Sequence, residues 1–123
     1  MGSLASSPAL PPCPDSPNCV STEARDPTHE IEPIPFTGPA EEIARRLVAA
    51  IEEMGGRVVD GPGGGRIHAE FSSRLLGFVD DVDLVVDGDG RVVRFRSASR
   101  TGYWDLGVNR RRMETLRRKL RGR

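Results

Sequence analysis

Hydrophobic residues recur at helical spacing in two segments of the chain. The first segment is preceded by Thr37, Gly38 and Pro39, contains two glutamates in its first turn, and is followed by Gly55 and Gly56. These are start and stop signals of helices. Its apolar residues lie three or four positions apart, the spacing of a buried helix face: Ile43, Leu47, Val48, Ile51 and Met54. The pattern predicts a helix over residues 39–54.

The second helical segment lies near the end of the chain. Met113, Leu116 and Leu120 recur at helical spacing among many arginines between residues 106 and 121. One side of this helix is therefore apolar and the other is strongly basic. Asp105 or Asn109 can cap its first turn. We expect the apolar side to pack on the core.

Between the two helices, apolar and polar residues alternate in four short runs. The alternation is typical of half-buried strands, and it covers residues 57–60, 66–74, 78–87 and 91–97. DGDG at residues 87–90 predicts a hairpin turn. GPGGG at residues 61–65 is flexible enough to hold a phosphate, but a strand follows it, whereas phosphate loops precede a helix.

Together these elements predict an α+β fold. The expected sheet is an antiparallel four-stranded meander, with two helices on its apolar face in a two-layer sandwich. Residues 1–37 are rich in proline, serine and acidic residues and predict an irregular N-terminal arm. Residues 38–123 would form a single α+β domain, and the length of 123 residues suits one small domain.

The polar face of the predicted sheet brings opposite charges together on adjacent strands. One interpretation is a ladder of cross-strand ion pairs exposed to solvent. The other is a concave polar site, in which burial shifts the pKa values of His68 and the aspartates toward acid–base use. The residues expected on this face are His68, Glu70, Ser72, Arg74, Asp81, Asp83, Arg94 and Arg96.

The segment FRSASRTGYWDLGVNR, residues 95–110, contains the single Trp and the single Tyr of the chain. Tyr103 and Trp104 come a few residues after the last predicted strand, near Ser99 and Arg100. Aromatic and arginine side chains at the end of a strand suit the rim of a binding pocket. This segment is therefore a candidate binding loop.

The charge of the chain is zero overall but uneven along its length. Residues 1–90 contain 6 basic and 16 acidic residues, whereas residues 91–123 contain 12 basic and 2 acidic ones. The basic end either neutralises the acidic part within the fold or binds an acidic partner. Specific nucleic-acid binding is not expected, because the core takes one side of the basic helix and its other side is more often solvated.

Two further features concern the compartment. Neither a membrane span nor a signal peptide is recognisable, so the sequence as given predicts a cytoplasmic protein, and a removed leader would make it extracytoplasmic. Cys13 and Cys19 lie in the turn-rich segment CPDSPNC. They are either a local disulfide or reduced structural thiols. A zinc site is not expected, because the only histidines are His29 and His68.

Three segments of the chain resemble the signature blocks of the bacterial and plastid family known as domain of unknown function 1499. They are CPDSPNCVS, HAEFSSRLLGFVDDVDL and FRSASRTGYWDLGVNRRR. The resemblance runs from Cys13 to about Leu120, nearly the whole chain. It implies no activity, because the family has no established one. Many members of the family carry a leader or membrane segment before the cysteine motif.

Two functional hypotheses follow, and neither requires a cofactor. In the first, the protein is a binding module for a small polar or anionic ligand or a protein partner. Its ligand would contact the polar sheet face and the Ser97–Asn109 loop, through His68, Glu70, Arg74, Asp81, Asp83, Arg94, Arg96, Ser99, Arg100, Tyr103, Trp104 and Asn109.

The second hypothesis is a small cofactor-independent enzyme. His68 or Asp81 would act as general base, and Arg96 or Arg100 would stabilise negative charge. The sequence contains no nucleophile elbow, metal-ligand cluster or dinucleotide fingerprint. Binding is therefore the favoured hypothesis.

Overall fold

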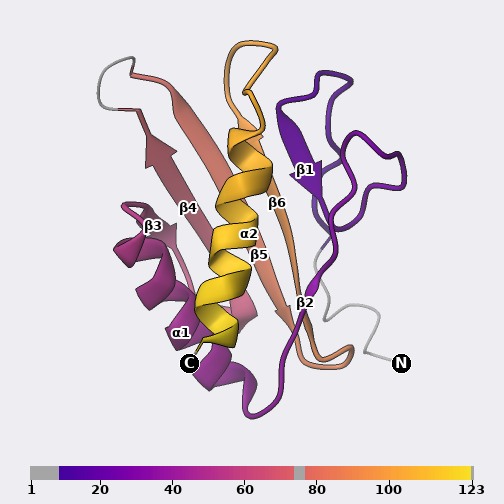
Figure 1. The fold of residues 1–123 in the computed structure, drawn as a ribbon. Coiled ribbons are helices and arrows are strands. Elements are labelled where there is room, and N and C mark those ends of the chain that lie inside the picture. Colours follow the sequence, from indigo (N-terminus) through magenta and orange to yellow (C-terminus); the bar gives the residue numbers. More distant parts are fainter. Residues whose placement is uncertain (1–8, 74–76, 123) are drawn as a thin grey trace.

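The computed structural model describes residues 9–73 and 77–122, and it shows an antiparallel sheet with two helices (Figure 1). The sheet has six strands in this part of the chain, with β1 and β2 both at the β6 edge and the order β1-β6-β5-β4-β3 across it. A short 3-10 turn, η2 (Gly63–Gly65), precedes β4. The strands are β1 (Cys19–Ser21), β2 (Ile34–Pro35), β3 (Arg57–Asp60), β4 (Arg66–Ser72), β5 (Val79–Asp87) and β6 (Val92–Ser99); the helices are α1 (Ala40–Glu53) and α2 (Val108–Arg121).

The predicted four-stranded sheet is wrong in its number of strands. The N-terminal arm, expected to be irregular, supplies β1 and β2, which both pair with β6. Cys19 lies opposite Ala98, and Ile34 lies opposite Val93. The cause is the open edge of β6, whose backbone groups need partners that the four-strand meander does not supply.

Buried Arg117 of α2 also holds the arm. Its guanidinium donates hydrogen bonds to the carbonyls of Glu32 at 2.7 Å and Pro33 at 3.0 Å. These bonds fix the segment just before β2. The arm is therefore part of the folded unit.

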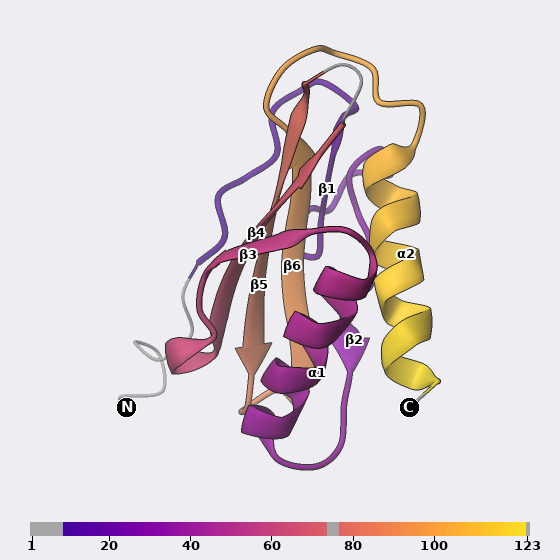
Figure 2. The same ribbon diagram turned by 90° about the vertical axis from the view of Figure 1, so that its left-hand side faces the viewer.

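Both helices cover the same face of the sheet (Figure 2). Buried residues of α1, including Leu47 and Ile51, join Met113 and Leu116 of α2 in one core with Leu84 and Phe95 of the sheet. This confirms the α+β class with its helices on one face. No helix in the described part of the chain is long and apolar enough to cross a membrane.

The end of α1 shows why two glycines stop this helix. Gly55 has a φ of 92°, a left-handed conformation that favours glycine. Gly56 N–H then bonds the carbonyl of Ile51 at 2.9 Å. A Cβ on Gly56 would lie 2.5 Å from the ring of Phe71, so the turn packs directly on β4.

Candidate functional site

The polar face of the sheet lies opposite the helices and contains a chain of ion pairs. Arg100, directly after β6, donates to both carboxylate oxygens of Asp81 at 2.7 and 2.9 Å. It also donates to Glu70 on β4 at 2.6 Å. Glu70 accepts a further bond from Arg57 on β3 at 2.8 Å. Four strands are thus linked by charges that neutralise one another.

His68 lies between two carboxylates of β5. Its Nδ1 is 2.8 Å from Asp83, and its Nε2 is 3.2 Å from Asp81. The antiparallel register places His68 directly opposite Asp83, which is why the alternation brings them together. Both ring nitrogens therefore have partners within the protein.

Arg100 also controls the protonation of its main partner. Its hydrogen bonds hold the pKa of Asp81 below the ordinary value, against the opposing effect of partial burial. The hydrogen bonds that Arg100 donates raise its own pKa; those to Asp81 have the larger effect, and the one to Glu70 adds to it. Asp81 is accordingly a weak base.

His68, Glu70 and Asp81 also form the one group of possible metal ligands among the residues that the structure describes. Their ligand atoms lie within 4.8 Å of one another. Arg100 already binds both carboxylates, so a metal ion would have to replace a paired guanidinium. The pairing of these carboxylates with Arg100 therefore disfavours metal binding by this group.

The arm contacts the polar face at the β6 edge. Arg96 donates to the carbonyl of Pro12 at 3.3 Å, and Arg94 lies 3.4 Å from the carboxylates of Glu23 and Asp87. Figure 2 shows the start of the described chain on the side of the sheet opposite α2. The arm therefore meets the arginines of β6.

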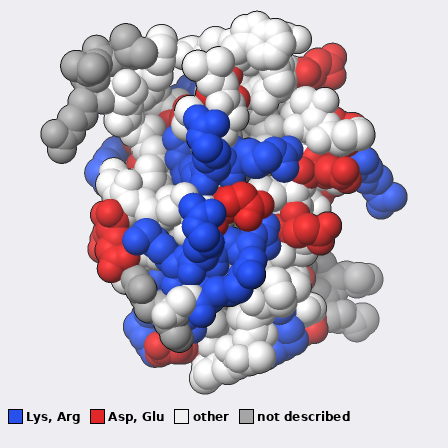
Figure 3. Space-filling view, in the orientation of Figure 1, with Lys and Arg blue, Asp and Glu red and all other residues white. Residues whose placement is uncertain are grey.

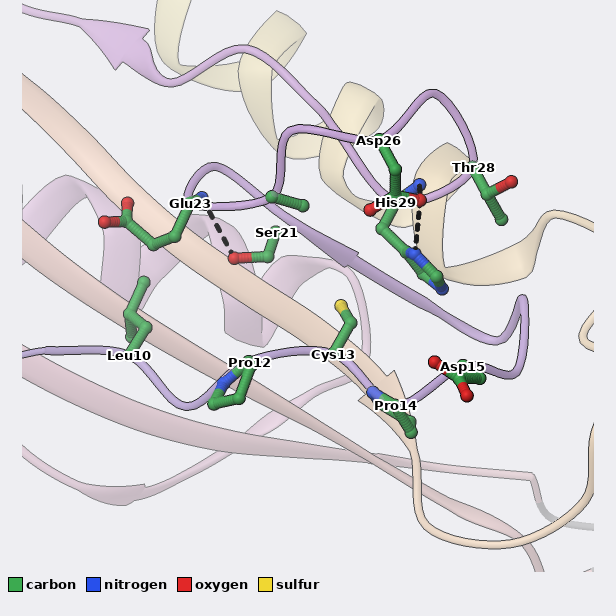
Figure 4. Close-up of a pocket in the computed structure, with 11 residues that line it drawn as sticks. Leu10, Pro12, Cys13, Pro14, Asp15, Ser21, Glu23, Asp26, Thr28 and His29 are labelled. Carbon is green, nitrogen blue, oxygen red and sulfur yellow. Dashed lines mark hydrogen bonds and ion pairs between the residues drawn. The ribbon is translucent and has the colours of Figure 1, made fainter.

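The arm also encloses a hollow of its own, of about 540 Å³ (Figure 4). Cys13 lines it and is bonded to Cys19 as a disulfide in this structure. His29 lies on the opposite wall and bonds Asp26 at 2.7 Å. None of the residues predicted to bind a ligand lines this hollow.

On the other side of the sheet, Asn109 is completely buried in a hydrogen-bond network. Its side-chain nitrogen donates to Ser99 at 3.0 Å and to Asp105 at 2.9 Å. Its oxygen accepts from Ser97 and Arg112, both at 2.7 Å. Asn109 therefore fastens α2 to β6, and the geometry gives it a structural role.

Asp80 and Arg112 extend this network and were not among the predicted site residues. Their side chains form an ion pair at 2.6 Å, and Arg112 also lies over the ring of Phe71. The phase of β5 could have revealed Asp80, because it precedes Val82 by two residues and so shares its face. The predicted site residue Arg74 lies outside the described residues.

The predicted Ser97–Asn109 loop spans the end of β6, the connecting loop and the start of α2, and it presents its aromatic residues to solvent. Tyr103 and Trp104 are both exposed and meet edge to face, with ring centroids 5.0 Å apart. Asp105 accepts hydrogen bonds from the backbone N–H groups of Gly107 and Asn109. Although partial burial acts in the opposite direction, these bonds and that from the Asn109 side chain hold the pKa of Asp105 low.

A hollow of about 1130 Å³ opens beside this loop. It lies between the loop, one side of α2 and the adjoining ends of β4 and β5, and residues just after α1 also line it. Its lining includes Met54, Phe71, Phe78, Trp104, Leu106 and Arg111. Of the predicted ligand-binding residues that the structure describes, Ser99 and Trp104 line it, whereas the described charged residues of the sheet face do not.

Comparison with known proteins agrees with the resemblance carried by the three motifs. No curated protein and no solved structure matches the chain. A family model described as "Protein of unknown function (DUF1499)" matches residues 9–120, which is most of the chain. The protein therefore belongs to the DUF1499 family.

Proposed function

We propose that the protein is a non-catalytic binding module and that its ligand surface is the hollow beside the Ser97–Asn109 loop. The observation that supports this most is the exposure of Phe78, Trp104 and Leu106 around one hollow. Large apolar side chains gathered on a surface are typical of binding sites. Concave, mainly apolar hollows with a few polar groups are the usual form of ligand sites.

The lining favours a ligand with both an apolar part and an anionic group. Arg111 lies on the α2 wall and donates to the carbonyl of Leu106 at 2.7 Å. No carboxylate in the described part of the chain lies within ion-pair distance of it. A guanidinium without a carboxylate partner is suited to bind an anion.

The polar sheet face is less suited to bind an anion than the sequence alone suggested. Arg100, Arg94 and Arg57 each have a carboxylate partner on this face. An anionic ligand would have to compete with these carboxylates. The arrangement supports the interpretation of this face as a stabilising ladder.

The enzyme hypothesis receives less support from the geometry. Both nitrogens of His68 are within hydrogen-bond distance of aspartates, and the pKa of Asp81 is lowered rather than raised. A general base works best with a pKa near the working pH. The lowered pKa of Asp81 makes it a poor general base, and the two nitrogens of His68 already have carboxylate partners.

The binding proposal can be tested with Trp104, because it is the only tryptophan and lines the hollow. We expect dodecanoate, below its micelle concentration, to shift Trp104 emission to the blue in a saturable way. Arg111→Gln should weaken this binding, whereas Arg66→Gln, an exposed arginine on the polar face, should not.

A second ligand separates the two parts of the proposal. Dodecyl maltoside has the same apolar chain without the charge, so it should bind more weakly than dodecanoate. An emission that does not respond to either amphiphile would refute the proposed ligand surface.

A further inference from the structure

Exposed apolar side chains are concentrated at one end of the molecule. Six large apolar residues are exposed within the described residues, and five of them belong to the segment just before β5, the loop after β6 and the start of α2: Phe78, Tyr103, Trp104, Leu106 and Val108. Four of these five line the same hollow, and Tyr103 packs on Trp104. These five residues are called the apolar tip below.

Within the apolar tip, Leu106 is held outward by a backbone conformation that disfavours leucine. It has a φ of 55° and is 85% exposed. Arg111 bonds its carbonyl, and Asp105 bonds the N–H of the next residue, Gly107. Folding gains little burial from this leucine, so its place in a strained turn points to a role outside the core.

The outer side of α2 continues from the apolar tip as a basic stripe. Val108, Arg111 and Arg118 are three and seven positions apart, which places them on one helix face, and all three are exposed. Arg118 donates to the hydroxyl of Thr115 at 3.1 Å. Figure 3 shows basic side chains gathered along α2, with uncharged surface at the end where the loop lies.

We propose that the apolar tip and the basic stripe dock on the surface of a lipid bilayer that contains anionic lipids. Trp104 and Leu106 would enter the headgroup region, while Arg111 and Arg118 bind the headgroups. Tryptophan and tyrosine favour this region because they combine an apolar body with a polar group. This inference rests on the proposed function, since it assigns the same surface to a lipid partner.

The shape of the surface favours a bilayer over an acidic protein. Trp104 is 74% exposed, and Leu106 still more, so both project from a loop. Projecting side chains enter a fluid interface without a matching pocket in the partner. Arginines near an anionic bilayer add attraction that decreases with salt.

The test uses the whole chain and sedimentation with two kinds of vesicle. One kind contains phosphatidylcholine alone, and the other contains phosphatidylcholine mixed with phosphatidylglycerol. We expect the protein to sediment with the mixed vesicles and to shift Trp104 emission to the blue. Both signals should weaken as salt is added, and phosphatidylcholine alone should bind less.

Matched variants test the two parts of the surface. Arg118→Gln should weaken binding to mixed vesicles about fivefold, because one charge at the bilayer is lost. Leu106→Gly should weaken it about tenfold, since an apolar side chain no longer enters the interface. The controls are Arg66→Gln and Val59→Ser, which remove an exposed arginine and an exposed apolar residue elsewhere.

Several results would overturn the inference. These are failure of the wild-type chain to bind mixed vesicles, equal binding to both vesicle types, and control variants as impaired as the tip variants. The inference would also be overturned if polyglutamate competed for the protein as well as the mixed vesicles do, because charge alone would then explain binding. The dodecanoate titration separates the two proposals, because Arg118 does not line the hollow. If the protein binds dodecanoate but not vesicles, only the bilayer proposal is refuted. If it binds neither dodecanoate nor vesicles, the proposed ligand surface and the bilayer proposal are both refuted.

Discussion

Arg100 and Asp81 are joined by two hydrogen bonds, at 2.7 and 2.9 Å, across the polar face of the sheet. A guanidinium that the sequence presents as a receptor for an anion is thus occupied by a carboxylate of its own chain. Glu70 accepts a third bond from Arg100. This pairing predicts an effect on stability that depends on pH.

Arg100→Gln should lower the melting temperature by a few degrees at pH 7 and by less at pH 3. Pairing with Arg100 lowers the folded-state pKa of Asp81, so its carboxylate stabilises the fold above the unfolded-state pKa and loses this contribution as the pH falls through the lowered pKa. In the variant, Glu70 and Asp81 also repel each other while both are ionised. Thermal unfolding at the two pH values measures the difference.

The control for this prediction is Arg45→Gln. Arg45 forms an exposed ion pair with Glu42 on α1, without the network of the sheet. Its removal should change stability less at pH 7. An Arg100→Gln effect that is the same at both pH values would contradict the account of Asp81.

Asn109→Ala should destabilise the protein by about 2 kcal/mol or more, because it leaves several buried polar groups without partners. Asn109 is completely buried and bonds Ser97, Ser99, Asp105 and Arg112. Urea unfolding at neutral pH measures the change. Thr101→Ala, at an exposed position of the same loop, is the control. A variant as stable as the wild type would show that the network adds nothing.

The main elements were predictable from the sequence because their patterns are long. Residues 66–72 and 79–87 alternate over many positions, and α1 repeats its apolar residues over several turns. The same alternation placed His68 opposite Asp83. Long runs fix both the type of element and the face that each side chain occupies.

The short strands and the buried network were not predictable in the same way. β1 and β2 contain three and two residues, too few to show a period. Asn109 was expected to cap the second helix or to contact a ligand, and only the packing of α2 on β6 buries it. The apolar tip likewise depends on the meeting of two segments that are distant in the sequence, at residue 78 and residues 103–108.

Removal of the disulfide by Cys13→Ala and Cys19→Ala together should cost about 2 kcal/mol, because the bond closes a small loop and restricts the unfolded chain. The two cysteines are six positions apart, and Cys19 lies in β1. Urea unfolding of the double variant and of the oxidised wild type measures the loss. Wild type treated with reductant should match the variant. Identical midpoints for the oxidised wild type and the variant would contradict this role.

Leu106→Gly should stabilise the fold by about 0.5–1 kcal/mol, although it is expected to weaken binding. Glycine adopts the positive φ of this position without the clash that a leucine Cβ makes, and part of that gain is lost to the greater freedom of the unfolded chain. The highly exposed side chain contributes little burial that could be lost. Urea unfolding measures the change, with Val59→Gly in β3 as a control that should destabilise. A gain in stability with a loss of vesicle binding would show that Leu106 is placed outward for its partner, whereas a clear loss of stability would show that it serves the fold.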